Sequence, residues 1–117
     1  MNQQRKKIAA LAELATIVLD VRLAALRKIA AERNASLAAL AALATPEAPP
    51  DDDISPITAA QAGLRYQQWA DLRRAEINMR LSLQTAEWQV QRESVTTAFG
   101  RTDALNRLGA KMKLARK

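Results

Sequence analysis

Hydrophobic residues recur along the first part of the chain at the spacing of an α-helix. Between residues 8 and 44 they return every three or four positions, and Arg22 and Arg33 fill the two gaps. The members of this stripe are Ile8, Leu11, Ala15, Leu19, Leu26, Ile29, Leu37, Leu40 and Ala44. A period of about 3.6 residues is typical of an almost straight helix. The pattern predicts a first helix over residues 3 to 44.

A second stripe begins after residue 56 and continues almost to the last residue. Its period of about 3.7 residues is also helical. Its members are Leu64, Gln68, Leu72, Ala75, Met79, Leu83, Ala86, Val90, Ser94, Thr97, Arg101, Leu105, Leu108 and Met112. We therefore predict a second helix over residues 57 to 115, with this stripe facing the first helix.

The segment TPEAPPDDDISP, residues 45 to 56, separates the two helices because it contains all four prolines of the chain. Proline lacks the amide hydrogen that a helix interior requires. Ser55 followed by Pro56 forms a favourable N-cap and first helical position, and Thr58 with Gln61 offers an alternative capping box. A connection of this kind favours a chain that folds back on itself. The sequence thus predicts a single domain over residues 1 to 117, an all-α, long antiparallel two-helix hairpin resembling a coiled-coil rod.

The second predicted helix is longer than the first, so part of it extends beyond its partner. If Ala44 lies beside Thr58, then Ile8 lies near Ser94. We therefore expect an overhanging C-terminal helix that begins near Val95.

The stretch AEINMRLSLQTAEWQVQRESV, residues 75 to 95, places hydrophobic residues on two opposite sides of the second helix. Because one neighbouring helix covers only one side, we expect the other side to bind a protein partner; the alternative is that a rotated first helix covers both flanks. The candidate partner-binding residues are Ile77, Leu81, Trp88, Val95 and Phe99. On this interpretation, Leu81→Ala with Trp88→Ala abolishes partner binding and leaves helicity and melting nearly unchanged.

The net charge of +6 is concentrated at the two ends of the chain. Residues 1 to 7 carry +3, residues 95 to 117 carry +5, and the middle carries −2. A hairpin brings the basic ends together, opposite an acidic turn with Glu47, Asp51, Asp52 and Asp53. This basic end either keeps the helix ends soluble or docks in an acidic cavity of a partner. Its candidate residues are Arg5, Lys6, Lys7, Arg101, Arg107, Lys111 and Lys113.

The composition removes several kinds of chemistry. The chain contains neither cysteine nor histidine, so thiolate and imidazole sites are excluded. We find no phosphate-binding loop, nucleophile elbow or metal-ligand cluster, and therefore expect no enzyme, metal or cofactor. The apolar run of residues 10 to 19 contains Glu13 and is too short to span a bilayer. The basic start before this run is compatible with a signal peptide, but the helical pattern continues to Leu43 without a convincing cleavage site, so we expect an unexported, cytoplasmic protein. The pI near 10.3 permits nonspecific nucleic-acid contact, but no stacking aromatics accompany the basic tail.

The sequences LRYQQWADLRRAEI, residues 64 to 77, and EWQVQRESVTTAFGRTDALNRLGAKMK, residues 87 to 113, resemble the FliJ/YscO stalk proteins of bacterial type III export systems. The resemblance implies a non-enzymatic stalk or adaptor, cytoplasmic or peripheral at the inner membrane. Its joined basic termini would dock into or on a hexameric export ATPase and couple it to the export gate, with export chaperones as further partners. The alternative is a coiled-coil structural or adaptor protein that self-associates through the Trp88 face.

Overall fold

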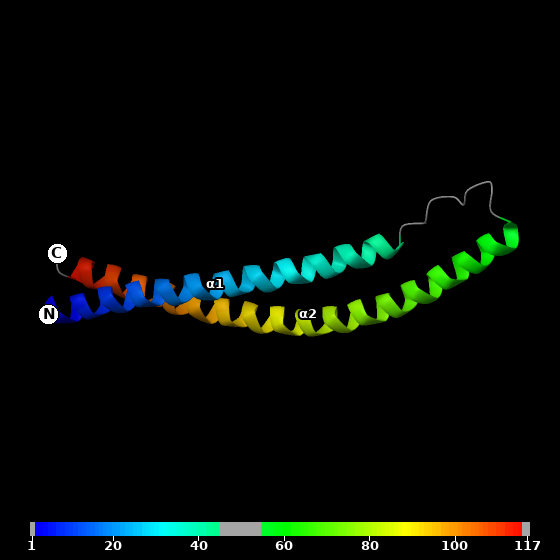
Figure 1. Cartoon of the computed structure of the whole chain (residues 1–117). Helices are drawn as coiled ribbons and strands as arrows, with labels where there is room; N and C mark the ends of the chain where they lie inside the picture. The colour runs from blue at the N-terminus through cyan, green and yellow to red at the C-terminus, as the bar shows by residue number, and fades with distance from the viewer. Residues whose placement is uncertain (1, 45–54, 116–117) are drawn as a thin grey trace. The chain divides into compact units, whose positions relative to one another are not determined.

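The computed structural model describes residues 2–44 and 55–115, which form two long helices (Figure 1). Helix α1 spans Asn2–Ala44 and helix α2 spans Pro56–Ala115. No strand occurs within the two described ranges, so the all-α class predicted from the sequence is confirmed. The predicted acidic residues of the turn lie outside the described residues: Glu47, Asp51, Asp52 and Asp53.

Helix α2 begins at the residues that the sequence indicates. The Ser55 hydroxyl accepts a hydrogen bond from the Thr58 backbone amide at 3.2 Å, and the Ser55 carbonyl accepts one from Ala59 at 2.9 Å. Pro56 occupies the first helical position, where a backbone amide would have no hydrogen-bond partner within the helix, so its missing amide hydrogen costs nothing. The predicted N-cap is therefore confirmed.

The chain divides into two compact units, each built from one segment of each helix. Unit 1 comprises Met1–Ala30 and Ala86–Lys117, and unit 2 comprises Ala31–Thr85. In each unit, a segment of α1 packs against a segment of α2.

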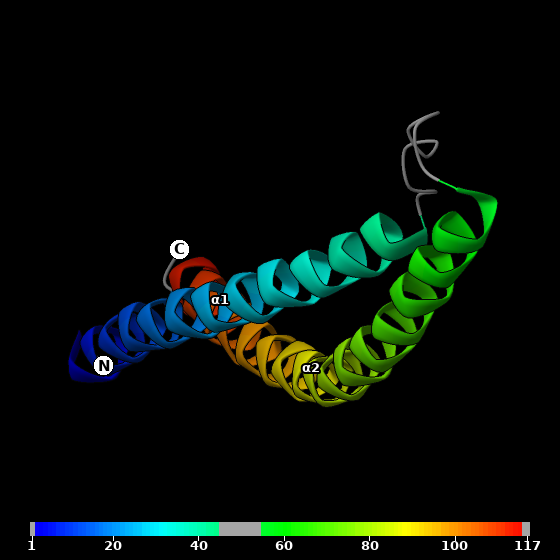
Figure 2. The same cartoon turned by 45° about the vertical axis from the view of Figure 1, so that its right-hand side comes forward.

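The two segments of unit 1 are antiparallel. The Arg22 guanidinium donates a hydrogen bond to the Ser94 hydroxyl. A methyl group placed on Gly109 would lie 3.9 Å from Cγ2 of Ile8. Because the earlier residue of α1 lies by the later residue of α2, the segments run in opposite directions, and they cross in the view of Figure 2.

Unit 2 shows the same antiparallel pairing, held by two hydrogen bonds between side chains. Arg33 Nε donates to Thr85 Oγ1 at 3.1 Å, and Ser36 Oγ donates to Gln84 Oε1 at 2.6 Å. Ser36 is buried, so this second bond satisfies a polar group that water does not reach. Antiparallel pairing in both units confirms the predicted two-helix hairpin.

The predicted overhang of the C-terminal part of α2 is not confirmed, because the register of the helices differs. The expected alignment placed Ile8 near Ser94. In the structure, Ser94 instead bonds Arg22, and Ile8 lies beside Gly109. The last turns of α2 thus lie alongside the first turns of α1.

The side chains that each helix turns toward the other recur at alternating steps of three and four residues, with few exceptions. In α2 the positions that follow these steps, all of them buried or half-buried, are Ala70, Arg74, Ile77, Leu81, Gln84, Trp88, Gln91, Val95, Ala98, Thr102, Leu105, Gly109 and Met112. In α1 they are Arg5, Ile8, Ala12, Ala15, Leu19, Leu23, Leu26, Ile29, Arg33, Ser36, Leu40 and Leu43. We call these positions the seam. Their seven-residue repeat is that of a coiled coil.

The stripe of α2 that was predicted to form the core is largely exposed. Leu64, Leu72, Met79, Leu83 and Val90 all face solvent. The prediction was wrong because it followed a period of about 3.7 residues, whereas two paired helices keep contact along positions that repeat every 3.5 residues. Over several turns the two sets of positions diverge onto different sides of α2.

The seam assignment is tested by two substitutions close together in α2. Ile77 is 1% exposed, so Ile77→Ala is expected to lower the free energy of unfolding by about 2–5 kcal/mol. Met79 is 71% exposed, so Met79→Ala is expected to change it by about 0.5 kcal/mol or less. Urea unfolding followed by circular dichroism measures both values. Equal effects of the two substitutions would contradict the assignment.

Candidate protein-interaction surfaces

The face predicted to bind a partner is mostly the seam itself. Ile77 is buried, and Leu81, Trp88 and Val95 are half-buried. The expectation that this side of α2 is left uncovered is therefore corrected for these four residues, because the side with the strict seven-residue spacing is the side that α1 covers. Only Phe99 remains largely free, with 61% of its surface exposed.

Trp88 combines packing with a charge interaction in unit 1. Its indole is half-buried at a seam position, and the Arg92 guanidinium lies 4.9 Å from the ring centroid. A cation held over an aromatic face is attracted by the electron density of the ring. Trp88 thus stabilises unit 1 and is not the centre of a free partner surface.

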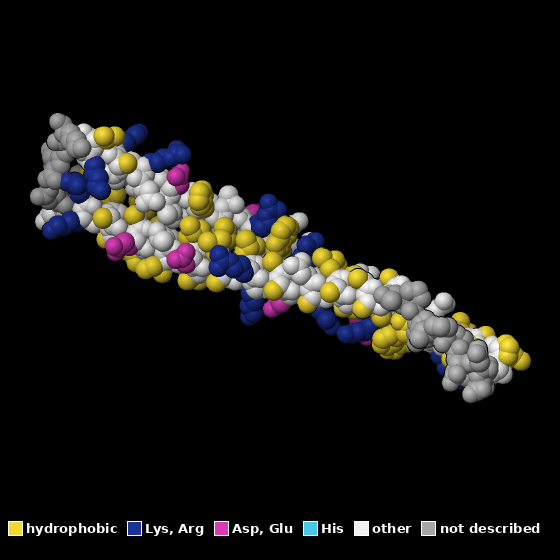
Figure 3. Space-filling view, turned by 90° about the horizontal axis from the view of Figure 1, so that it is seen from above, with side chains coloured by type: hydrophobic (Ala, Val, Ile, Leu, Met, Phe, Trp, Pro, Cys, Tyr) yellow, Lys and Arg dark blue, Asp and Glu magenta, His cyan; other side chains and the backbone are white. Residues whose placement is uncertain are grey.

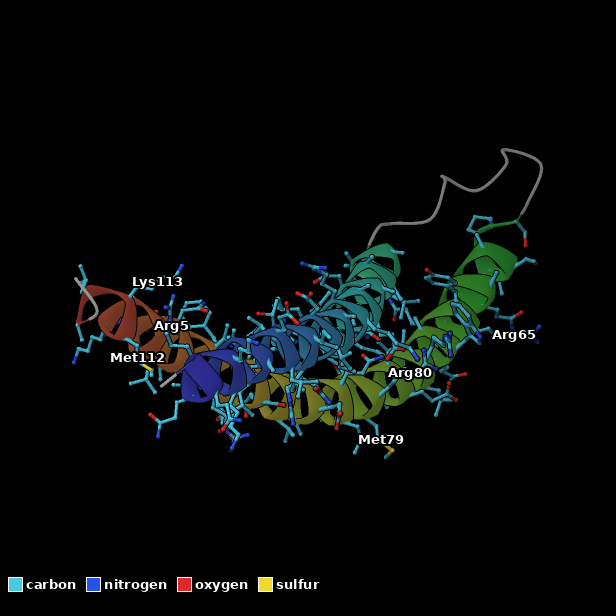
Figure 4. All side chains as sticks on the ribbon, turned by 90° about the vertical axis from the view of Figure 1, so that its left-hand side faces the viewer. Arg5, Arg65, Met79, Arg80, Met112 and Lys113 are labelled. Atoms are coloured by element: carbon cyan, nitrogen blue, oxygen red, sulfur yellow. The ribbon has the colours of Figure 1, made fainter. Side chains whose placement is uncertain are left out.

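Unit 2 exposes a hydrophobic stripe along α2. Leu72, Met79 and Leu83 are exposed, and Figure 4 shows Met79 pointing away from α1. The flanking charged residues are paired within the helix: Arg74 contacts Asp71 at 2.7 Å, and Arg73 contacts Glu76 at 3.1 Å. Exposed pairs of this kind contribute little to stability. We call the three exposed hydrophobic residues the outer stripe.

Unit 1 contains a hydrophobic groove between its two helix segments, with a volume of about 470 Å³. Its lining residues are Leu11, Leu14, Ala15, Val18, Ala98, Arg101, Ala104 and Leu105. We call it the lateral groove. Leu11 belongs to the predicted core stripe of the first helix, whereas Leu14 and Val18 do not. The signal was present, since these three residues are separated by three and four positions, as on one face of a helix.

The structure brings the two basic ends of the chain together in unit 1. Arg5 and Lys6 of α1 and Lys113 of α2 line one cavity, together with the hydrophobic residues Ile8 and Met112. Figure 4 shows Arg5, Met112 and Lys113 at the same end of the two helices. We call this site the terminal cavity; its volume is about 560 Å³.

The other predicted basic residues lie elsewhere on unit 1. Lys7 and Lys111 are exposed outside the terminal cavity, and Arg107 contacts Asp103 at 3.1 Å. Arg101 lines the lateral groove. The predicted basic end is therefore divided between a cavity, a groove and the open surface.

The charge of the chain differs between the two units. The sequence of unit 1 contains 13 Lys and Arg residues against 5 Asp and Glu residues, a net charge of +8. The sequence of unit 2 contains 5 basic and 7 acidic residues, a net charge of −2. Figure 3 shows Lys and Arg side chains where the start of α1 meets the end of α2, and further ones along the helices. By net charge, unit 1 therefore attracts anionic surfaces more strongly than unit 2.

Within residues 2–44 and 55–115, no three acidic, His or Cys side chains gather in a way that could hold a metal ion. No helix in the described part of the chain is long and apolar enough to cross a membrane.

No protein-family model, curated protein or solved structure matches the chain. The interaction surfaces are therefore interpreted from their own residues.

The role of Trp88 is tested against that of Phe99, an aromatic residue on the same helix of the same unit. Trp88→Ala removes seam packing and the contact with Arg92, so we expect a loss of about 2 kcal/mol or more in unfolding free energy. Phe99→Ala removes an exposed ring and is expected to cost about 0.5 kcal/mol or less. Thermal melting compares the two. If the Trp88 variant were as stable as the Phe99 variant, the assignment of Trp88 to the seam would be wrong.

Proposed function

We propose that the protein is a non-enzymatic adaptor whose terminal cavity binds an acidic surface of a protein partner. The observation that carries this proposal is the meeting of Arg5, Lys6 and Lys113 around one cavity in unit 1. Like charges repel when they are brought close together, and an anionic partner relieves that repulsion. The fold brings these basic residues together from both ends of the chain, and the resulting cluster can bind an anionic partner.

The hydrophobic lining of the terminal cavity supports a protein partner. Ile8, Leu105 and Met112 are half-buried and lie beside the basic side chains. A partner that covers them gains hydrophobic burial in addition to charge attraction. Protein interfaces combine these two contributions, with apolar contacts inside a polar rim.

We propose, more specifically, that the partner is the hexameric ATPase of a bacterial type III export system. The resemblance to FliJ/YscO stalk proteins supports this assignment, because in that family the joined termini enter the central hole of such a ring. The protein would then couple the ATPase to the export gate, in the cytoplasm or at the inner face of the membrane. Export chaperones are further candidate partners.

A second candidate function is a structural coiled-coil protein that self-associates. The seam no longer offers a free face for this, because Ile77 is enclosed within unit 2. The observation that favours self-association is the outer stripe, whose residues Leu72, Met79 and Leu83 are exposed. Hydrophobic side chains aligned on one helix face are a frequent means of helix association.

The proposed ATPase contact is tested by reversing the charge of the terminal cavity. Arg5→Glu, Lys6→Glu and Lys113→Glu together are expected to weaken co-sedimentation with a purified hexameric export ATPase by about tenfold or more. The matched control reverses Arg65 and Arg80, two exposed arginines of unit 2. Wild-type binding is expected to fall as salt concentration rises.

Two results would reject the ATPase assignment. One is a wild-type chain that does not co-sediment with the ATPase at low salt. The other is a terminal-cavity variant that binds as tightly as the control variant. Sedimentation equilibrium distinguishes the second candidate function from the first. Self-association through the outer stripe gives a dimer, and Met79→Ser is expected to convert that dimer to monomers.

A further inference from the structure

We infer that the lateral groove of unit 1 binds an amphipathic helix of another protein, with hydrophobic residues on one side and carboxylates along its flanks. The lateral groove has no role in the proposed ATPase contact, which uses the terminal cavity. The two sites share Leu105 but no charged residue. Either proposal can therefore fail without the other.

The shape of the groove fits a helix. Leu11, Leu14 and Val18 project from one face of α1 at steps of three and four residues, and exposed Val21 continues the series. Leu14 is 58% exposed and Val18 is 42% exposed, although both are strongly hydrophobic. A third helix laid along this row places its own residues between them, as in coiled-coil packing.

The α2 side of the groove allows close approach. Ala98 and Ala104 line the groove opposite the α1 row, and their small side chains leave space between the helices. The distance between packed helices falls as the contacting side chains become smaller. A helix in the groove therefore contacts α1 and α2 at the same time, which is the helix-in-groove mode of recognition.

The net charge of unit 1, and not the stretch of α1 that carries Glu13 and Asp20, favours an acidic helix in the groove. Arg101 is the one charged residue in its lining. The unit as a whole carries a net charge of +8. Carboxylates on the flanks of a bound helix are attracted to these cations, while lysines on the same flanks are repelled.

The same charge argues against a second copy of this chain as the occupant. The α1 row of a second copy would bring Glu13 and Asp20, but also a second unit with a net charge of +8. Two surfaces of like charge repel each other, and this repulsion weakens their association. A different, acidic protein is the occupant that the observations favour.

Two synthetic peptides of about three heptads provide the probes. Both carry the same leucine pattern on one face; the flanking positions are glutamate in one peptide and lysine in the other. Fluorescence anisotropy with the full chain is expected to show binding of the acidic peptide and at least about tenfold weaker binding of the basic peptide. Low and high salt are compared, because the difference depends on charge.

Variants of the chain then locate the binding site. Leu14→Ser with Val18→Ser is expected to weaken binding of the acidic peptide by about tenfold or more. The matched control, Leu72→Ser with Met79→Ser, removes two exposed hydrophobic side chains of unit 2 and is expected to leave binding unchanged. Arg101→Glu is expected to weaken binding of the acidic peptide and to strengthen binding of the basic one. This third variant changes only an exposed charge and preserves the helix packing.

Four results would overturn the inference. Two concern the peptides: the acidic peptide would fail to bind, or the two peptides would bind equally. Two concern the variants: the control variant would lose as much affinity as the groove variant, or Arg101→Glu would leave the preference between the peptides unchanged. A wild-type dimer that Leu14→Ser with Val18→Ser disperses, without peptide binding, would assign the groove to a second copy.

Discussion

The antiparallel seam between α1 and α2 determines which surfaces of this protein are free. A helix pair has one line of contact, and the residues on that line must repeat every 3.5 positions to remain in it. In α2 that line passes through Ile77, Leu81, Trp88 and Val95. Once they are covered, Leu72, Met79 and Leu83 are left to solvent.

Polar residues in the seam specify its register. Alanine-rich helices present small, similar side chains at many positions, so hydrophobic packing alone changes little when one helix slides by a turn. The bonds of Arg33 with Thr85 and of Ser36 with Gln84 form only in one alignment. In any other alignment, the buried Ser36 hydroxyl would lose its partner, at a cost of about 1–3 kcal/mol.

The register has a direct consequence for charge. With Arg22 bonded to Ser94, the last turns of α2 reach the first turns of α1. Arg5 and Lys113 therefore line the same cavity, although more than a hundred residues separate them in the chain. The local net charge that supports the proposed partner contact is thus produced by the seam and not by either end alone.

A pair of helices also has too little interior to bury the hydrophobic residues it carries. Unit 1 leaves Leu11, Leu14 and Val18 along the lateral groove, and unit 2 leaves the outer stripe. Exposed hydrophobic rows of this kind are typical of proteins that bind others. The inferred binding of a helix in the lateral groove follows from this shortage of interior, whereas the proposed adaptor function rests on the basic residues of the terminal cavity.

The sequence by itself determined the helices, the N-cap at Ser55, the antiparallel return and the concentration of positive charge near both ends. These features depend on local spacing, proline chemistry and chain connectivity. It did not determine which of two opposed hydrophobic faces of α2 becomes the seam, and the stripe first predicted as core proved to be exposed. Only the tertiary structure decided that choice, the register and the lateral groove, because each depends on how side chains of one helix fit against those of the other.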